Sequence, residues 1–238
     1  MNLIKRLLQI NMAIVSMYCH GQGTNGYQVI GEVTGLPVGT KMYLIDGGKR
    51  KTIDSATVKN DQFTFKGILA EPAHMYLHAG RGRMANKLAD ILLDNRTVYV
   101  KGSKPEYDSV KVSGSDIDQY WKDWYKEDQK IGYQRYRIKQ VYASLTAKKD
   151  TANANVLGKL IEELQLARID LLKTYVKRQP NTAAGAALPT LCTLGDYLTG
   201  ADYMEMFNTL TPTWQQSSFG KEILVQARKK RDRSLPTK

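Results

Sequence analysis

The stretch from Ile53 to Gly67, IDSATVKNDQFTFKG, restricts the fold of this chain more than any other segment does. β-Branched and aromatic residues alternate with polar ones on both sides of a short polar segment, which is the usual signal of two strands joined by a turn. Asn60 and Asp61 stand at the turn, and both tolerate the positive φ that tight hairpin turns require. We therefore predict a β-hairpin with an architectural role, in which Phe63 and Phe65 point into the core.

Short runs with the same alternation recur through residues 27–114, separated by Gly, Pro, Asn and Asp. Outside the predicted hairpin, these runs are Tyr27 to Val33, Lys41 to Asp46, His74 to Leu77, Ala89 to Leu93, Thr97 to Val100 and Ser109 to Val112. Asp94-Asn95 separates two of them and predicts a second hairpin turn. Strands of this number and spacing predict an antiparallel β-sandwich or open barrel over residues 22–114.

At Ser115 the alternation gives way to apolar residues spaced three or four positions apart, which is the pattern of amphipathic helices. Ser115 or Asp116 can cap a first long helix, and Asp150 or Thr151 can cap a second one that ends before Pro180. Two such helices with a short polar connection are expected to pack antiparallel.

Shorter helices complete the predicted bundle: one from Asn181 or Thr182 through Leu194, one from Ala201 to Leu210, and one from Phe219 to about Lys230. Residues 115–238 are thus predicted to form an α-helical region that ends in a loose basic tail. The predicted fold class is α+β, with an N-terminal antiparallel β-sandwich or open barrel followed by a C-terminal helical bundle.

Residues 1–21 have the features of a signal peptide, namely Lys5 and Arg6 before an apolar run and small residues before a cut after Gly21. A second interpretation makes Cys19 the lipid-bearing first residue of an outer-membrane lipoprotein, but the bulky Tyr18 before it departs from that pattern. We therefore expect an exported, periplasmic protein, or an outer-membrane lipoprotein if Cys19 is lipidated. The remaining sequence has no apolar run long enough for a transmembrane helix, so no span is expected in the mature chain.

The chain is basic, with a formal net charge of +12, but its cations are spread out. Their only dense cluster in the sequence is Arg228 to Arg233, at the end of the last predicted helix, where the helix dipole favours positive charge. Binding of a polyanion such as lipopolysaccharide is an alternative that this charge supports, whereas nucleic acid is not expected as a partner. Removal of Cys19 would leave Cys192 without a disulfide partner and among apolar residues, which predicts a buried thiol of low reactivity.

Sequence motifs identify no catalytic, cofactor or metal site in this chain. His74 and His78 share one face of a predicted strand but lie roughly 13 Å apart along it, too far to bind one metal ion. The loop from Gly80 to Arg83 lacks the following helix and the Lys-Ser/Thr pair of a phosphate-binding loop. We therefore predict no enzyme activity, no catalytic residue and no cofactor.

The first long predicted helix is rich in aromatic residues, and Trp121 and Trp124 fit its packing face. Its other aromatic side chains stand beside lysines and arginines and could instead form a surface for a glycan or a protein partner. Packing between the helices or against the sheet is the favoured interpretation. If the protein has a functional surface, this helix and the loop around Gly80 are the places where we expect it. These other aromatic residues are Tyr120, Tyr125, Tyr133 and Tyr136.

A series of short motifs runs through the predicted strands in a fixed order: Ile30-Gly31-Glu32-Val33, Tyr43-Leu44-Ile45, Ile53-Asp54-Ser55-Ala56, Phe63-Thr64-Phe65-Lys66-Gly67, Glu71-Pro72 and Val112-Ser113-Gly114-Ser115. In this order they resemble the domain of unknown function that precedes thioredoxin-like (thiol:disulfide interchange) domains in exported Bacteroidota proteins. The helical part is similar to the segment that follows this domain, at Gln179-Pro180-Asn181-Thr182 and at Ser217 to Ile223. The Trp-Cys-x-x-Cys motif of the thioredoxin-like domain is absent from this sequence, so the resemblance implies an accessory, non-catalytic module in the cell envelope.

These observations together predict an exported, non-catalytic binding or scaffold module of the cell envelope, whose partner is an unknown protein or small ligand. One alternative is an accessory role beside a separate thioredoxin-like oxidoreductase, in which Cys192 would form a mixed disulfide. The other alternative is an envelope protein that binds a polyanion through its basic surface.

Overall fold

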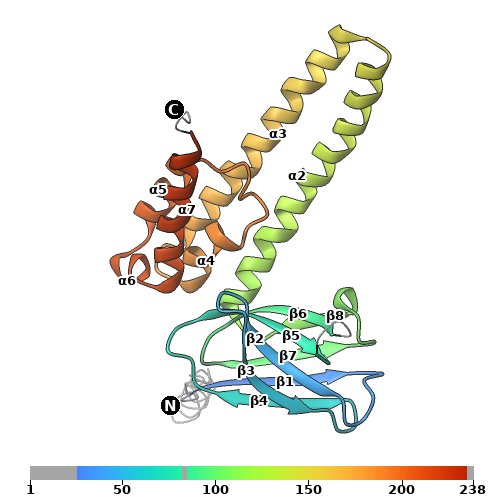
Figure 1. Ribbon diagram of the computed structural model, residues 1–238, viewed down its shortest axis with the longest axis vertical. Coiled ribbons are helices and arrows are strands. Elements are labelled where there is room, and N and C mark those ends of the chain that lie inside the picture. Colours follow the sequence, from blue (N-terminus) through green and yellow to red (C-terminus); the bar gives the residue numbers. More distant parts are fainter. Residues whose placement is uncertain (1–25, 82–84, 235–238) are drawn as a thin grey trace, which may run out of the picture.

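The computed structural model describes residues 26–81 and 85–234, in which eight β-strands precede six α-helices (Figure 1). The strands form two four-stranded sheets, with the strand orders β4-β1-β7-β8 and β3-β2-β5-β6. The predicted α+β class, with N-terminal sheets and C-terminal helices, is confirmed. The strands are β1 (Tyr27–Val33), β2 (Lys41–Asp46), β3 (Lys51–Thr57), β4 (Gln62–Gly67), β5 (Ala73–Ala79), β6 (Asn86–Leu93), β7 (Thr97–Gly102) and β8 (Val110–Ser113), with a 3-10 turn η2 (Tyr107–Ser109) before β8.

The two sheets pack face to face because each has one apolar side. In β1, β2 and β4, buried residues alternate with more exposed ones, as expected when one face of a strand is covered. The buried side chains of both sheets meet in one core, which includes Phe63 and Phe65 with their ring centroids 5.8 Å apart. The predicted sandwich and the core position of these two rings are therefore confirmed.

One pair of neighbouring strands departs from the predicted antiparallel arrangement. β1 and β7 run parallel, whereas the other strand pairs within residues 26–81 and 85–113 are antiparallel. Parallel neighbours cannot be joined by a tight turn, and here five other strands lie between them along the chain. The sheet that contains β1 is therefore mixed.

The predicted hairpin between Ile53 and Gly67 is wrong, although its turn is present. Asn60 and Asp61 have φ values of 51° and 60°, as the turn prediction requires. On either side of the turn, however, the chain enters a different sheet, because β3 pairs with β2 and β4 pairs with β1. Val58 bonds to the residue before β2, and Asp61 bonds to the last residue of β1. The strands before and after the turn therefore pair with other strands and not with each other.

The second predicted hairpin, around Asp94-Asn95, is wrong for the same reason. β6 pairs with β5 in one sheet, whereas β7 lies in the other sheet. The Asn95 side chain bonds the backbone N and O atoms of Leu69, both at 2.8 Å, and so holds the connection between β4 and β5. Both turns are corners at which the chain crosses from one sheet to the other.

Each of the first four helices of the described chain begins with a capping side chain. Ser115, Asp150, Thr182 and Thr199 each accept a hydrogen bond from a backbone N–H group in the first turn of the helix that follows. The third helix in the predicted order, α4, ends at Leu191 instead of reaching Leu194, because the next residue has an extended backbone. The short α6 was not predicted. The helices are α2 (Asp116–Ala147), α3 (Thr151–Arg178), α4 (Ala183–Leu191), α5 (Gly200–Thr209), α6 (Pro212–Gln215) and α7 (Ser218–Ser234).

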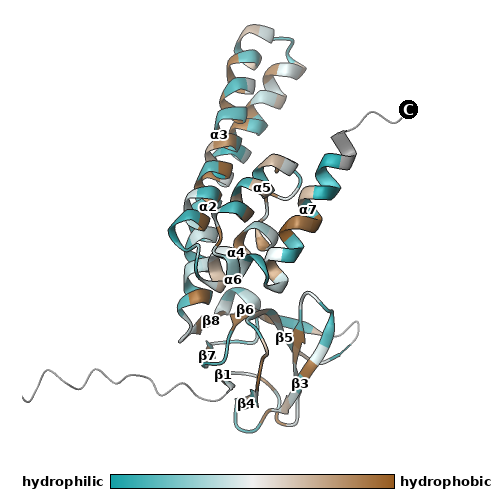
Figure 2. Ribbon diagram, turned by 90° about the vertical axis from the view of Figure 1, so that its left-hand side faces the viewer, coloured by the Kyte–Doolittle hydropathy of each residue, from teal (hydrophilic) through white to brown (hydrophobic). Residues whose placement is uncertain are grey.

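The helices α2 and α3 form a long antiparallel hairpin that stands on one end of the sandwich and projects beyond the other helices (Figure 1). The antiparallel packing of the two long helices is thereby confirmed. The other helices pack beside the half of the hairpin that is nearer the sandwich (Figure 2). Within residues 26–81 and 85–234, no helix combines the length and apolarity needed to cross a membrane. The predicted signal peptide, residues 1–21, and the end of the predicted tail, residues 235–238, lie outside the described residues.

Candidate binding cleft

The contact between the sandwich and the helices is made by β6, which is buried on both of its faces from Leu88 to Leu93. Ile91 and Leu93 belong to the sandwich core. Leu92 points the other way and packs with Ala184 and Ala187 of α4. A single strand therefore contributes to the sandwich core and to the junction with the helices.

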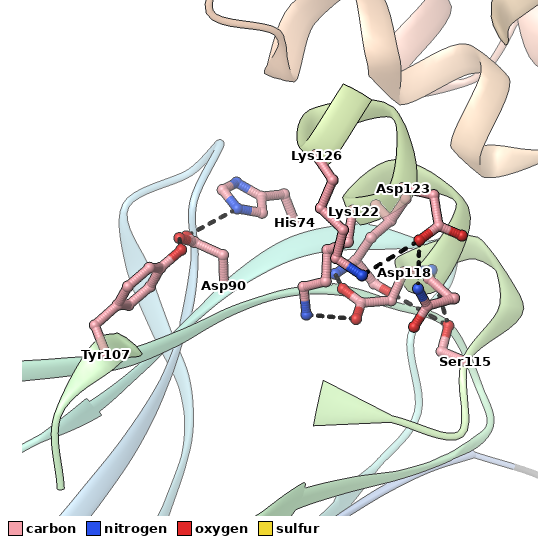
Figure 3. Close-up of polar contacts among 10 residues, drawn as sticks. His74, Asp90, Tyr107, Ser115, Asp118, Lys122, Asp123 and Lys126 are labelled. Atoms are coloured by element: carbon pink, nitrogen blue, oxygen red, sulfur yellow. Dashed lines mark hydrogen bonds and ion pairs between the residues drawn. The ribbon is translucent and has the colours of Figure 1, made fainter. Parts of the chain in front are cut away.

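A buried carboxylate, Asp118, fixes the start of α2 to the end of β6 (Figure 3). Its Oδ1 accepts a hydrogen bond from Leu92 N at 2.8 Å, and its Oδ2 pairs with Lys122 Nζ at 2.6 Å. Ser115 Oγ donates to Leu92 O at 3.5 Å and accepts from Asp118 N at 3.3 Å. Burial raises the pKa of Asp118, and the neighbouring Lys122 opposes this shift only in part. These bonds set the position of α2 over the outer face of β5 and β6.

The outer face of β5 carries His74, Tyr76 and His78, while the residues between them point into the core. The His74 and Tyr76 ring centroids are 4.8 Å apart, and those of Tyr76 and His78 are 6.1 Å apart. Trp121 of α2 packs edge-on against His74 at 5.3 Å. The two histidines share one face, as predicted, with a tyrosine between them. In the part of the chain that the structure describes, no group of three or more potential metal ligands is found.

Asp90 lies opposite Tyr76 on the neighbouring strand and is the charged centre of this face (Figure 3). His74 Nε2 lies 3.2 Å from its Oδ1, while its Oδ2 accepts from Tyr107 OH at 2.7 Å and pairs with Lys87 Nζ at 2.6 Å. Lys87 Nζ also sits over the Tyr76 and Tyr107 rings, 4.8 and 5.1 Å from their centroids. Burial acts to raise the pKa of Asp90, but hydrogen bonds from His74, Lys87 and Tyr107 outweigh it and lower the pKa to about 2.

A cleft of about 790 Å³, called here the junction cleft, opens beside this network between the sandwich and the helices. Its sandwich wall is made by the β2–β3 turn (residues 46–50), the β4–β5 connection (residues 69–71) and the side chains of His74 and Tyr76. Its helical wall is made by the end of α4 and the first turns of α7. The helical residues are Thr190, Leu191, Ser218, Phe219, Glu222 and Gln226.

Gly47 lies close against two rings of the cleft wall. A Cβ atom at this position would lie 2.9 Å from His74 Nδ1 and 3.1 Å from a ring carbon of Tyr76. A side chain at this position would therefore require the two rings to shift. The glycine keeps this part of the wall thin and the rings accessible.

Two of the carboxylates that line the cleft, Asp46 and Glu71, are engaged in bonds that hold its walls. Asp46 accepts from Lys49 N at 2.8 Å and pairs with Lys49 Nζ at 3.4 Å, which closes the β2–β3 turn. Glu71 Oε2 accepts from Ser218 N at 3.0 Å and so ties the β4–β5 connection to the first residue of α7. The cleft can accordingly hold a ligand through ring surfaces and hydrogen bonds, with its polar wall already positioned.

The aromatic residues of α2 divide into a packed group and an exposed group. Trp124 is fully buried, and Tyr120 OH donates to Tyr175 O at 2.8 Å, so the predicted packing role is confirmed for this side of the helix. Tyr133 and Tyr136 are 64% and 59% exposed, and packing does not account for them. The other predicted surface, the loop around Gly80, falls partly on residues 82–84, which lie outside the described residues.

Cys192, the residue proposed for a redox role, follows directly after α4. Its Sγ donates to Pro189 O at 3.4 Å. Burial raises the pKa of the thiol to about 11, so it is protonated at neutral pH. The residue is only partly buried, so the predicted burial is met in part and the low reactivity stays a prediction.

Sequence reasoning missed both the cleft and the two buried aspartates beside it. Asp90 carried a signal, because it is the one charged residue inside the apolar run from Leu88 to Leu93. A charge in such a run is buried and needs partners when the run forms a strand. The cleft itself carried no local signal, since its walls come from segments more than 100 residues apart.

No curated protein and no solved structure matches this chain. A family model described as a domain of unknown function (DUF4369) matches residues 27–120, from the first strand of the sandwich to the first turn of α2. The match confirms the predicted resemblance to a domain of unknown function, and it covers the sandwich wall of the junction cleft, the Asp90 network and Asp118. Residues 27–120 of this chain are therefore similar to the family named DUF4369.

Proposed function

We propose that this protein is an exported, non-catalytic binding module of the cell envelope, and that the junction cleft holds its ligand. The observation that carries the proposal is the joint construction of the cleft, in which the sandwich and the helical region each supply a wall. Ligand sites in proteins are commonly found at such boundaries, with apolar walls and a few positioned polar groups.

The chemistry of the walls indicates the kind of ligand. Tyr76 and Phe219 supply ring surfaces from the two sides, and His74 presents its imidazole beside Gly47. Rings of this kind contact the flat faces of sugars, aromatic groups and peptide side chains. We therefore infer a small ligand with a flat apolar face and hydrogen-bonding groups at its edge.

The bonding of the polar groups supports binding rather than catalysis. Glu71 and Asp46 accept hydrogen bonds from backbone N–H groups, and His74 Nε2 lies within hydrogen-bond distance of Asp90. These groups connect the sandwich, the β2–β3 turn and α7. Their partners are part of the fold itself, which is what a rigid binding site requires.

A screen by two-dimensional ¹H–¹⁵N NMR with sugars, short peptides and aromatic fragments tests the proposal. We expect shift changes to gather at residues 46–50, 69–76, 190–191 and 218–226. Tyr76→Ala should weaken binding of a hit by about tenfold, because a ring contact contributes on the order of 1 kcal/mol. Tyr99→Ala is the matched control, since this tyrosine is 44% exposed on the other sheet and should leave affinity unchanged.

Shift changes that gather elsewhere on the protein would contradict the proposal, as would equal loss of affinity in both tyrosine variants. A weaker alternative is an accessory role beside a separate thioredoxin-like oxidoreductase. The protonated thiol of Cys192 gives that role little support.

A further inference from the structure

The outer side of α2 carries a row of exposed residues that the junction cleft does not involve. Lys126, Lys130, Tyr133 and Arg137 are spaced four, three and four positions apart, so they lie on one face of the helix. We call these four residues the basic strip. All four are exposed, and Tyr136 lies beside them with 59% of its surface exposed.

The opposite side of α2 faces α3, which leaves the strip free. Trp124 and Asp128 lie on that opposite side, and Asp128 is bonded to Arg168 of α3 by two contacts of 2.7 Å. The helices α4 to α7 pack beside the hairpin (Figure 1), and the four side chains of the strip stay exposed. The strip extends over about 16 Å, at the rise of an α-helix.

The cations of the strip are poorly compensated. Lys126 pairs with Asp123 at 3.5 Å, but Lys130 and Arg137 have no ion-pair partner among residues 26–81 and 85–234. The sequence from Gln129 to Lys149 contains no carboxylate at all. Its cations are Lys130, Arg135, Arg137, Lys139, Lys148 and Lys149. This stretch therefore carries positive charge with no carboxylate of its own to balance it.

We propose that the basic strip is a docking surface for an acidic helical segment of a partner protein. The positive strip is complementary to a row of glutamates or aspartates on one helix face. Tyr and Arg, which flank each other here, are enriched at the energetic centres of protein–protein interfaces. The strip is straight and one helix face wide, which suits a second helix lying along it.

The same residues fit other anionic surfaces less well. Helices that bind membranes place Trp, Phe and Leu opposite their cations, and the apolar side of α2 is instead packed on α3. Nucleic acid demands neutralisation of many phosphates along a broad surface, whereas the strip is a single row. A second copy of this chain would bring a further excess of positive charge toward the strip.

The proposal is tested with a fluorescein-labelled peptide of about 20 residues built from Glu, Ala and Leu, long enough to form a helix. Fluorescence anisotropy at low salt should show binding that weakens as NaCl rises, because exposed charges are screened. A counterpart peptide with Gln in place of Glu should not bind. The charge-reversal variant K130E/R137E should lose about tenfold or more in affinity, and Tyr133→Ala should weaken binding without changing the charge.

The variant K66E/K111E is the matched control, because it changes the net charge by the same amount on exposed sandwich positions. It should bind the acidic peptide as the parent protein does, and circular dichroism should show that all variants keep their helices. Equal losses in the two charge-reversal variants would overturn the proposal, since only net charge would then matter. Tighter binding to a DNA duplex or to phosphatidylglycerol vesicles than to the acidic peptide would also overturn it. So would a dimer of the parent protein that K130E/R137E dissociates, because a second copy would then occupy the strip.

Discussion

Two carboxylates at the junction, Asp90 and Asp118, are both buried, and their surroundings shift their pKa values in opposite directions. Burial acts in the same sense on both, because it disfavours the charged form. Asp90 has donors on both oxygens, from His74, Tyr107 and Lys87, and these overcome the effect of burial. Asp118 has one backbone donor and one lysine, and burial prevails there. Asp118 is also the more deeply buried of the two, at 1% exposed against 8% for Asp90. Deeper burial and fewer donors together explain why its pKa rises while that of Asp90 falls.

The lowered pKa of Asp90 predicts a specific loss of stability in acid. The folded protein binds this proton more weakly than the unfolded chain does, since the pKa falls from 3.8 to about 2. The ionised group therefore stabilises the fold above about pH 4, by about 2 kcal/mol, and this contribution is lost as the pH falls through about 2. Urea unfolding of the parent protein and of Asp90→Asn, at pH 5 and at pH 2, measures this contribution to the unfolding free energy.

The difference in unfolding free energy between the two proteins should shrink by about 2 kcal/mol from pH 5 to pH 2. Other carboxylates titrate in both proteins and cancel in this difference. Thr64→Ala is the control, because it changes an exposed side chain that has no titratable group, so its difference from the parent should stay constant with pH. A pH-independent difference for Asp90→Asn would refute the assignment of the lowered pKa to this residue.

At the scale of whole elements, the sequence predicted where strands and helices lie better than how strands pair. Alternation located all the strands of the sandwich, and capping residues located the starts of α2 and α3. Pairing failed at Asn60-Asp61 and at Asp94-Asn95, because a turn signal reports only the local backbone angles. The strand on each side of a turn joins whichever sheet has a strand with unpaired backbone groups beside it. The residues of the turn do not determine which sheet that is.

A buried ion pair links α2 to α3, which gives a prediction at this scale. Arg168 donates from two nitrogens to the two oxygens of Asp128, each at 2.7 Å, and Asp128 is 1% exposed. Asp128→Ala should lower the free energy of unfolding by about 3–5 kcal/mol, because Arg168 is then left partly buried without its partner. Tryptophan fluorescence during urea unfolding measures the loss.

The double variant D128A/R168M separates the two causes of this loss. It should be more stable than Asp128→Ala alone, since the uncompensated charge is removed as well. Glu205→Ala is the surface control: Glu205 pairs with Lys173 at 2.7 Å but is 62% exposed, so its loss should cost less than about 1 kcal/mol. A double variant that is less stable than Asp128→Ala would show that packing, and not charge, explains the effect.

At the scale of the whole molecule, the candidate site arises only where the sandwich and the helices meet. The junction cleft takes its walls from the β2–β3 turn, the β4–β5 connection and the starts or ends of α4 and α7. Glu71 bonds Ser218, a residue 147 positions later in the chain. Sequence patterns describe neighbours along the chain, so a site of this kind could not be predicted before the fold was known. The basic strip, in contrast, lies on one helix and was visible as exposed aromatics among cations.

The same junction predicts that the sandwich and the helices unfold together. Leu92, on the outer face of β6, is fully buried against Ala184 and Ala187, and Trp121 and Phe219 pack around this contact. Leu92→Ala should cost about 2–5 kcal/mol, because it leaves a cavity in the contact that couples the two parts. The tryptophans, at positions 121, 124 and 214, all lie in the helical region, so their fluorescence reports only on that part.

Hydrogen exchange of sandwich peptides, measured by mass spectrometry at each urea concentration, reports on the other part. In the parent protein both signals should change at the same urea concentration, as one cooperative unit. In Leu92→Ala the tryptophan signal should change first, because the helices lose their support while the sandwich core remains filled. Leu88→Ala is the matched control: Leu88 is equally buried but belongs to the sandwich core, so the variant should be destabilised while its two signals still coincide. Coincident signals in Leu92→Ala would show that the hydrogen bond between Asp118 and Leu92 N is enough to couple the sandwich to the helices.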